Sequence, residues 1–154
     1  MREVDREAAF RRLAEARVGR LATADATGIP HVVPFVFALD GSTVYWAVDR
    51  KPKRSRSLKR LQNIRANPNV ELVVDGYSEE WSDLWWIRAA GTARIVEERS
   101  EFDRAIGLLQ AKYSQYRDGP PPGPVVAIDI LRWSAWESRG HDPAHAEANG
   151  YDEV

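Results

Sequence analysis

The chain has 154 residues, no cysteine and a formal net charge of -1, with 22 basic and 23 acidic residues. This length is expected to form one domain with its own core, and the lack of cysteine excludes disulfides, thiolate metal sites and cysteine nucleophiles. Balanced charge argues against a nucleic-acid partner, and the charged N-terminal sequence predicts neither a secretion signal nor a membrane span. We therefore expect a cytoplasmic protein with no membrane partner, with one domain over residues 1–138 and a polar tail over residues 139–154.

The first part of the chain predicts a helix and then an antiparallel meander. Residues 5–16 carry apolar side chains at helical spacing, with Asp5 as a candidate N-cap. Strand-like runs separated by glycine-containing turns follow at residues 18–24, 29–39 and 43–48.

The run 29–39 differs from an ordinary strand in two ways. It is apolar on both faces, so both faces need cover, and it contains Pro34. A proline has no N–H for a strand ladder and indicates an edge strand or a bulge. Core packing alone could account for the apolar residues but not for the proline; the alternative is that a partner subunit or a flat ligand covers one face.

Residues 50–60 contain seven cations and no acidic residue. A helical pattern starts near Ser55 and Ser57 and ends at Asn67-Pro68, so the helix begins inside this cationic segment. Free backbone N–H groups and the positive end of the helix dipole bind phosphate, and nearby Lys and Arg side chains add charge. The segment predicts an anion-binding site; the alternative is a solvated basic loop.

The second half predicts three more strands and one more helix. The strands are expected at residues 70–74, 84–96 and 126–131. The helix is expected to begin at a capping pair, Ser100 with Asp103. An acidic loop over residues 75–83 and a proline-rich loop over residues 117–123 separate these elements. The pattern predicts a mainly β (α+β) fold, a six-stranded split antiparallel β-barrel with flanking helices.

A series of short motifs follows one order between about Val18 and Trp136. They are Gly19-Arg-Leu-Ala-Thr23, Gly28-Ile-Pro-His-Val-Val-Pro34, Asp40-Gly41, Asp49-Arg-Lys-Pro-Lys53 with Leu58-Lys-Arg-Leu61, Asn63-Ile-Arg-Ala-Asn-Pro68 and Trp85-Trp-Ile-Arg-Ala-Ala-Gly91. In this order they resemble the FMN-binding split-barrel family of flavin and deazaflavin enzymes related to pyridoxamine 5'-phosphate oxidase. The greatest similarity is to the actinobacterial branch described as F420-dependent enzymes.

The resemblance implies a homodimer with a cofactor at each of two sites in the subunit interface. Against the tricyclic ring it places Val33, Pro34, Phe35, Ala47 and Val48. Against the phosphate it places Lys51, Lys53, Arg54, Ser55, Arg56 and Ser57. It also implies pocket-lining roles, from either subunit, for Trp85, Trp86, Trp133 and Trp136, whose alternative is a place in the core or a dimer contact.

The cationic segment bears on the choice of cofactor. The deazaflavin coenzyme F420 has a phosphodiester followed by glutamates, and this longer polyanion fits seven cations better than the single phosphate of FMN. We expect an F420-dependent oxidoreductase that transfers a hydride to a small conjugated or aromatic substrate. The alternatives are an FMN-dependent enzyme like pyridoxamine-phosphate oxidase and a non-catalytic protein that binds a coenzyme or a tetrapyrrole.

The sequence offers no catalytic constellation of its own. A GxSxG motif, a Walker loop and a nucleophile–base–orienter trio are missing, so we assign no catalytic residue. Tyr45, Tyr77, Tyr113 and Tyr116 are candidate proton donors without a preference among them. His141 and His145 have metal-ligand spacing but lie in the polar tail beside Pro143, so we expect no metal site.

Overall fold

The computed structural model describes residues 4–49 and 54–138. Its strands form one antiparallel sheet in the order β2-β1-β5-β6-β7-β4-β3. They are β1 (Gly19–Ala24), β2 (Pro30–Phe35), β3 (Ala38–Asp40), β4 (Thr43–Ala47), β5 (Asn69–Gly76), β6 (Trp85–Ile95) and β7 (Val125–Glu137). The helices are α1 (Arg6–Glu15), α2 (Arg54–Ala66), the 3-10 turn η1 (Trp81–Asp83), α3 (Arg99–Lys112) and α4 (Gln115–Asp118). The predicted split barrel is confirmed, with seven strands in place of six.

The additional strand arises because the predicted run 29–39 is interrupted at Val36 and Phe37. The backbone N–H of Phe37 donates to the hydroxyl of Tyr113 at 3.2 Å, and its carbonyl accepts from Nζ of Lys112 at 2.9 Å. These backbone groups are therefore bonded to side chains at the end of α3 instead of to a neighbouring strand. Those partners lie 76 and 75 residues further along the chain, so no local pattern reveals the interruption.

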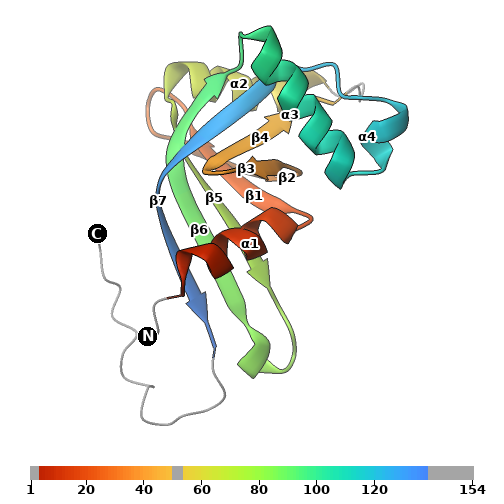
Figure 1. Ribbon diagram of the computed structural model, residues 1–154. Coiled ribbons are helices and arrows are strands. Elements are labelled where there is room, and N and C mark those ends of the chain that lie inside the picture. Colours follow the sequence, from red (N-terminus) through yellow and green to blue (C-terminus); the bar gives the residue numbers. More distant parts are fainter. Residues whose placement is uncertain (1–3, 50–53, 139–154) are drawn as a thin grey trace.

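Strands β2 and β3 are consecutive in the chain but lie at opposite edges of the sheet. Only Val36 and Phe37 connect them, so Phe35 and Ala38 are three residue steps, or at most about 11 Å, apart. The sheet therefore curls until its edges almost meet, which gives the half-open barrel of Figure 1. We call this meeting point of the two edges, residues 35–38, the seam.

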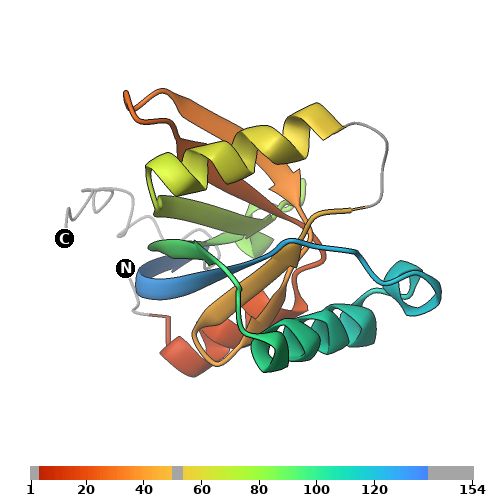
Figure 2. The same ribbon diagram turned by 90° about the horizontal axis from the view of Figure 1, so that it is seen from above.

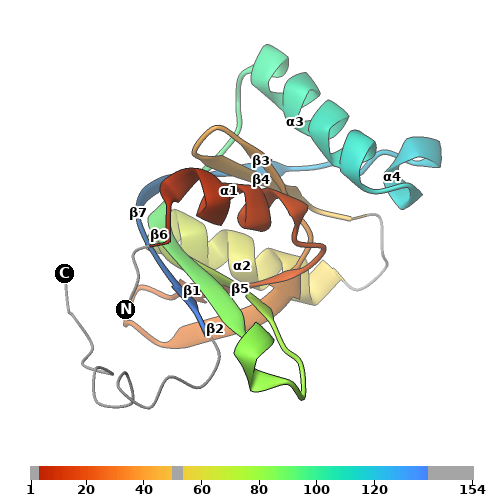
Figure 3. The ribbon, with the colours of Figure 1, turned by 60° about the horizontal axis from the view of Figure 1, so that its bottom comes forward.

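Helices α1 and α2 pack into the interior of the curled sheet. Ala9, Phe10 and Leu13 of α1 share one buried cluster with Leu61 and Ile64 of α2 and with the inward side chains of the strands. Figure 3 shows α1 in front of α2, with strands around both. The prediction of α1 is confirmed, including the N-cap, because the Asp5 carboxylate accepts the N–H of Glu7 at 3.4 Å.

Helix α3 lies on the opposite side of the molecule from α2, as Figure 2 shows. It packs against β4 and the start of β7 through a second buried cluster that contains Tyr45, Ala105 and Ala127. Polar contacts reinforce this packing: Arg94 of β6 donates to both carboxylate oxygens of Glu101 and, through Nε, to Asp129 at 2.9 Å. The hydroxyl of Tyr45 donates to Glu101 at 3.0 Å.

Three local predictions need correction. Helix α3 begins at Arg99, its N-cap is Glu98, and no side chain caps it, so the Ser100–Asp103 capping pair is wrong. The proline-rich loop was predicted to begin at residue 117, but it begins two residues later because α4 extends to Asp118. The last strand does not end at residue 131 but extends to Glu137, and a register shift opposite Ala90 and Gly91 leaves Leu131 as an extra residue within it. This bulge breaks the alternation that a sequence pattern can detect.

Candidate cofactor site

The predicted ring site lies at the seam. Among the described residues β2 pairs with β1 alone, so Pro34 is in an edge strand, as its missing N–H predicted. At the opposite side of the seam, Ala47 ends β4, and Val48 continues it by donating its N–H to the carbonyl of Pro124 at 3.0 Å. Chain segments that are far apart in the sheet order therefore come together here.

The five predicted ring contacts differ in accessibility. Phe35 is 5% exposed and stacks on Phe37 with ring centroids 5.0 Å apart, so its side chain belongs to the core. Pro34 is exposed, whereas Val33, Ala47 and Val48 are half-buried. The side chain of Phe35 is therefore part of the core beneath the seam, while the other four residues remain accessible to a ligand.

The predicted phosphate contacts fall in two groups. Lys51 and Lys53 lie outside the described residues. Arg54, Ser55, Arg56 and Ser57 form the first turn of α2, for which the structure describes the backbone. A helix therefore begins in the cationic segment, and its first backbone N–H groups lie there.

A polar cluster that the sequence did not predict lies beside this helix. Arg60 of α2 is half-buried and places its guanidinium carbon 4.9 Å from the ring centroid of Trp46. The Nε of Arg60 is buried and has no hydrogen-bond partner among the described residues. Burial lowers the pKa of Arg60, and the nearby charge of Asp49 partly opposes that shift.

Asp49 and Tyr116 complete this cluster. The hydroxyl of Tyr116, on α4, donates to Oδ1 of Asp49 at 2.7 Å. Burial raises the pKa of Tyr116, and the hydrogen bond to Asp49 raises it further. The sequence could have indicated Arg60 alone, because it shares one helical face with Asn63 and Ile64, which are buried. Its meeting with Asp49 and Tyr116 depends on the tertiary fold.

The predicted tryptophans lie far from Ala47 within one chain. Ala47 pairs with Val125 at the start of β7, whereas Trp133 comes eight residues later on that strand, which corresponds to roughly 26 Å along a strand. Trp133 packs edge-on against Phe10 at 5.8 Å, and Trp85 lies under the guanidinium of Arg12 at 5.2 Å. Within one chain, Trp85 and Trp133 are partly buried and pack against the core cluster.

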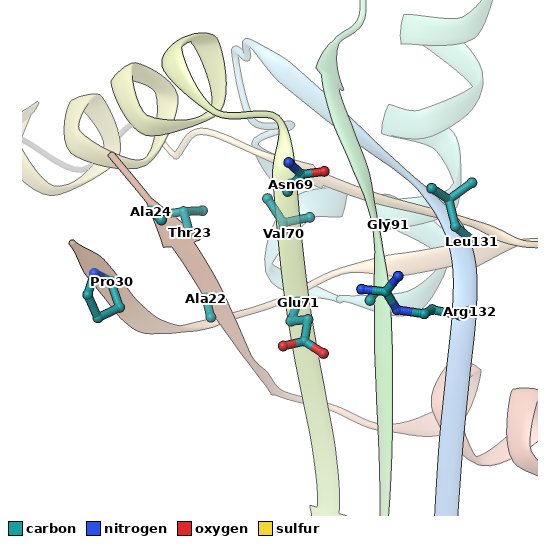
Figure 4. A pocket seen from close by; sticks show the side chains of 11 residues that line it. Ala22, Thr23, Ala24, Pro30, Asn69, Val70, Glu71, Gly91, Leu131 and Arg132 are labelled. Atoms are coloured by element: carbon teal, nitrogen blue, oxygen red, sulfur yellow. The ribbon is translucent and has the colours of Figure 1, made fainter. Parts of the chain in front are cut away.

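A shallow pocket of about 320 Å³ lies away from the seam, on the outward side of the sheet. Figure 4 shows its small floor residue Gly91 between the side chains of Glu71, Leu131 and Arg132. Trp86 and Trp136 line a second depression on the sheet, with Arg20 and Asp75. These pockets do not include the predicted ring or phosphate residues.

The barrel interior holds a few buried polar groups. Asn63 donates to the hydroxyl of Thr23 at 3.0 Å. His31, which faces Thr23 across the β1–β2 ladder, has a buried Nδ1 without a partner in the described part of the chain. Over residues 4–49 and 54–138, no group of three or more potential metal ligands occurs. No helix in the same residues is long and apolar enough to cross a bilayer.

The curled antiparallel sheet with its seam defines a split-barrel protein. The chain belongs to the pyridoxamine 5'-phosphate oxidase family, whose match extends over residues 6–137. That match identifies the family and does not distinguish its F420-dependent branch. No curated protein matches the chain.

Solved structures share the fold. One is a conserved hypothetical protein from Mycobacterium tuberculosis, with 18% identity, a TM-score of 0.71, and coverage of 89% of this chain and 90% of that one. A second is an FAD-binding protein from Mesorhizobium loti, with 23% identity, a TM-score of 0.66, and coverage of 87% and 95%. A third is HutZ, a heme storage protein from Vibrio cholerae, with 17% identity, a TM-score of 0.66, and coverage of 88% and 95%. At these identities the similarity shows the fold alone.

Proposed function

We propose that this protein binds a flavin-type redox cofactor at the seam, coenzyme F420 in preference to FMN, and transfers a hydride to a small conjugated or aromatic substrate. The observation that carries the proposal is the half-buried guanidinium of Arg60, whose Nε has no partner among the described residues. Removing a cation from water without a hydrogen-bond partner is unfavourable, and an anionic ligand would supply that partner.

The chain around Arg60 fits the anionic part of such a cofactor. Helix α2, which carries Arg60, begins in the cationic segment 50–60. A helix start and clustered cations both favour phosphate, and a coenzyme with several negative charges gains more from them than one with a single phosphate. This charge argument favours F420.

Residues of the chain have distinct roles in this proposal. Arg60 and the first turn of α2 would hold the phosphate, and Val33, Pro34, Ala47 and Val48 would support one side of the ring. When bound, the coenzyme supplies the hydride, while the protein orients the reactants and excludes water. No proton donor is assigned, and solvent can serve.

FMN is the second candidate cofactor. The chain belongs to the pyridoxamine 5'-phosphate oxidase family, and a protein of the same fold from Mesorhizobium loti is described as FAD-binding. A role in binding without catalysis is the third possibility, since another protein of this fold, HutZ, is described as a heme storage protein.

Titration of the purified full chain separates these possibilities. Oxidised F420, FMN, FAD and haemin are added at one fixed salt concentration, and quenching of tryptophan fluorescence is followed. We expect saturable quenching by F420, with a lower Kd than for FMN and a Kd that rises with salt. Saturation by FMN alone would assign the protein to the flavin enzymes, and saturation by haemin alone would contradict a redox role. Turnover of reduced F420 with small conjugated acceptors then distinguishes an enzyme from a binding protein.

The role of Arg60 is tested by Arg60→Gln, with Arg65→Gln as the control. Arg65 lies on the same helix but is exposed. A hydrogen bond to a charged group contributes about 1.5–3 kcal/mol, so Arg60→Gln should weaken binding of phosphate-bearing cofactors by at least about tenfold. Riboflavin, which has no phosphate, should bind both variants like the unaltered protein. An equal loss for riboflavin and FMN would show that Arg60 does not hold the phosphate.

We further propose a homodimer formed through the outer sheet face, defined as the outward side chains of β2, β1, β5, β6 and the second half of β7. One cross-strand row on this face consists of Val32, Ala22, Glu71, Ala90 and Arg132. Val32 is 66% exposed and Leu131 is 73% exposed. Exposed apolar residues interspersed with both signs of charge suit a two-fold interface, which must be complementary to itself.

A further inference from the structure

Asp49 lies between the two parts of the proposed cofactor site. It directly follows Val48, whose backbone N–H is fixed by the carbonyl of Pro124 at 3.0 Å. It precedes the cationic segment that leads into α2. In a cofactor whose ring meets Val48 and whose phosphate meets α2, the group between ring and phosphate would pass Asp49. In both FMN and F420 that group is a sugar-alcohol chain.

The hydrogen bond from Tyr116 fixes the side chain of Asp49, whereas Tyr116 is held in place by other contacts. The backbone carbonyl of Tyr116 accepts from Gln110 at 3.0 Å, its N–H donates to Tyr113 at 3.0 Å, and its ring packs edge-on against Tyr113 at 6.0 Å. Helix α4 is thus anchored without the phenolic hydroxyl. The side chain of the exposed Asp49, in contrast, has the 2.7 Å bond from Tyr116 as its one hydrogen bond among the described residues.

The remaining bonding capacity of Asp49 suits hydroxyl groups. A carboxylate is acceptor-only and has about four lone-pair sites, of which Tyr116 uses one at Oδ1. Oδ2 has no partner in the described part of the chain. A carboxylate repels phosphate but accepts strongly from O–H donors. The guanidinium of Arg60 interacts electrostatically with Asp49, and Arg60 is the residue proposed to hold the phosphate.

We propose that Asp49, oriented by Tyr116, accepts hydrogen bonds from the sugar-alcohol chain that joins the ring of the cofactor to its phosphate. Asp49 is then a binding residue and Tyr116 a positioning residue. This inference rests on the proposed function, since it requires a flavin or a deazaflavin at the seam.

Three probes with one ring system test the inference. Lumiflavin has a methyl group in place of the chain, riboflavin adds the chain, and FMN adds the phosphate; the deazaflavin counterparts form a parallel series. Asp49→Asn should weaken riboflavin by about tenfold and leave lumiflavin unchanged. It should weaken FMN by a smaller factor, because the substitution also removes the repulsion between the carboxylate and the phosphate. Tyr116→Phe should act in the same direction by a smaller factor, again without affecting lumiflavin. The lumiflavin measurement separates positioning from general loss of structure, which would weaken every ligand.

Tyr45→Phe is the matched control, because Tyr45 also donates to a carboxylate, that of Glu101, but on the α3 side of β4. It should leave all three affinities unchanged. Tighter FMN binding by Asp49→Asn with unchanged riboflavin binding would show that Asp49 only opposes the phosphate, and would overturn the inference. So would unchanged affinities for all probes, or unaltered protein that binds riboflavin no better than lumiflavin. Failure of the unaltered protein to bind either ring series would instead overturn the proposed function, and the inference with it.

Discussion

Lys112 is a half-buried amine with no acidic partner among the described residues. Its Nζ donates to the carbonyl of Phe37 at 2.9 Å and lies 4.2 Å from the ring centroid of Phe37. Burial, assisted by the charge of Arg17, lowers the pKa of Lys112 from its ordinary 10.5 to about 8. The folded protein therefore gives up this proton at a lower pH than the unfolded chain does.

The depressed pKa predicts a stability change at alkaline pH. Between about pH 8 and pH 10.5 the unfolded chain binds more protons at this site, so the free energy of unfolding should gain from Lys112 as the pH rises. Lys112→Met should lack that gain, whereas Lys59→Met, at an exposed position of α2, should retain it. Urea unfolding at pH 7.5 and pH 9.5 measures the difference. If the free energy of unfolding of Lys112→Met changed with pH as it does in the unaltered protein, the lowered pKa of Lys112 would be contradicted.

Strand β6 has a glycine, Gly91, opposite the bulge of β7. A Cβ added at Gly91 would overlap the backbone carbonyl of Asp129 in β7, so the two strands can approach this closely only without a side chain there. Gly91→Ala should lower the free energy of unfolding by about 2–3 kcal/mol. Gly107→Ala is the control, because nothing lies within 4 Å of a Cβ at this position of α3. It should be neutral or stabilise by about 0.5–1 kcal/mol. Chemical unfolding of both variants gives the comparison, and equal effects would contradict the close approach.

Helix α3 is held to the sheet partly by Arg94. Its bonds to Glu101 and Asp129 raise the pKa of Arg94, the bond to Glu101 most. The Arg94 side chain is 45% exposed, so solvent weakens these bonds, and we expect Arg94→Gln to cost about 1–2 kcal/mol. Arg99→Gln removes an ion pair to Asp103 that is 83% exposed at the arginine, and it should change stability by less than about 0.5 kcal/mol. Similar losses measured by urea unfolding would refute a special role for Arg94.

Elements with a strong local pattern were predicted well. The apolar stripe of α1 is buried at Ala9, Phe10 and Leu13, and the strand expected at residues 84–96 is observed as β6 at Trp85–Ile95. Elements set by distant contacts were not. The break at Phe37 depends on α3, and the bulge at Leu131 depends on the register with β6.

The candidate site follows the same division. Composition and spacing indicated the cationic start of α2 because a run of like charge is visible in the sequence itself. The cluster of Arg60, Asp49 and Tyr116 was not predicted, since three separate segments supply it and its evidence is burial and hydrogen bonding. Periodicity could place Phe35 in a strand but could not show that its ring lies in the core.

At the scale of the whole molecule, the outer sheet face leads to a prediction about the oligomeric state. A charge introduced at Val32 would lie inside the proposed interface, so Val32→Arg should shift the protein from dimer to monomer in analytical ultracentrifugation. Ala111→Arg on the exposed side of α3 should leave the dimer intact. A monomeric unaltered protein would contradict the proposed homodimer, and a dimer that survives Val32→Arg would place the interface elsewhere. Loss of the dimer should also weaken cofactor binding, because the resemblance to the split-barrel family implies a cofactor in the subunit interface.

The two prolines of β2 protect the rim of the half-open barrel. Pro30 and Pro34 are four residues apart and therefore have the same orientation in the strand. Since neither has an N–H, the ladder to β1 must draw its donors from the intervening positions, and the rim facing away from β1 presents few donors to another chain. Strand addition is thereby discouraged. A strand of another polypeptide therefore cannot easily pair with this edge, which protects the protein against aggregation into fibres.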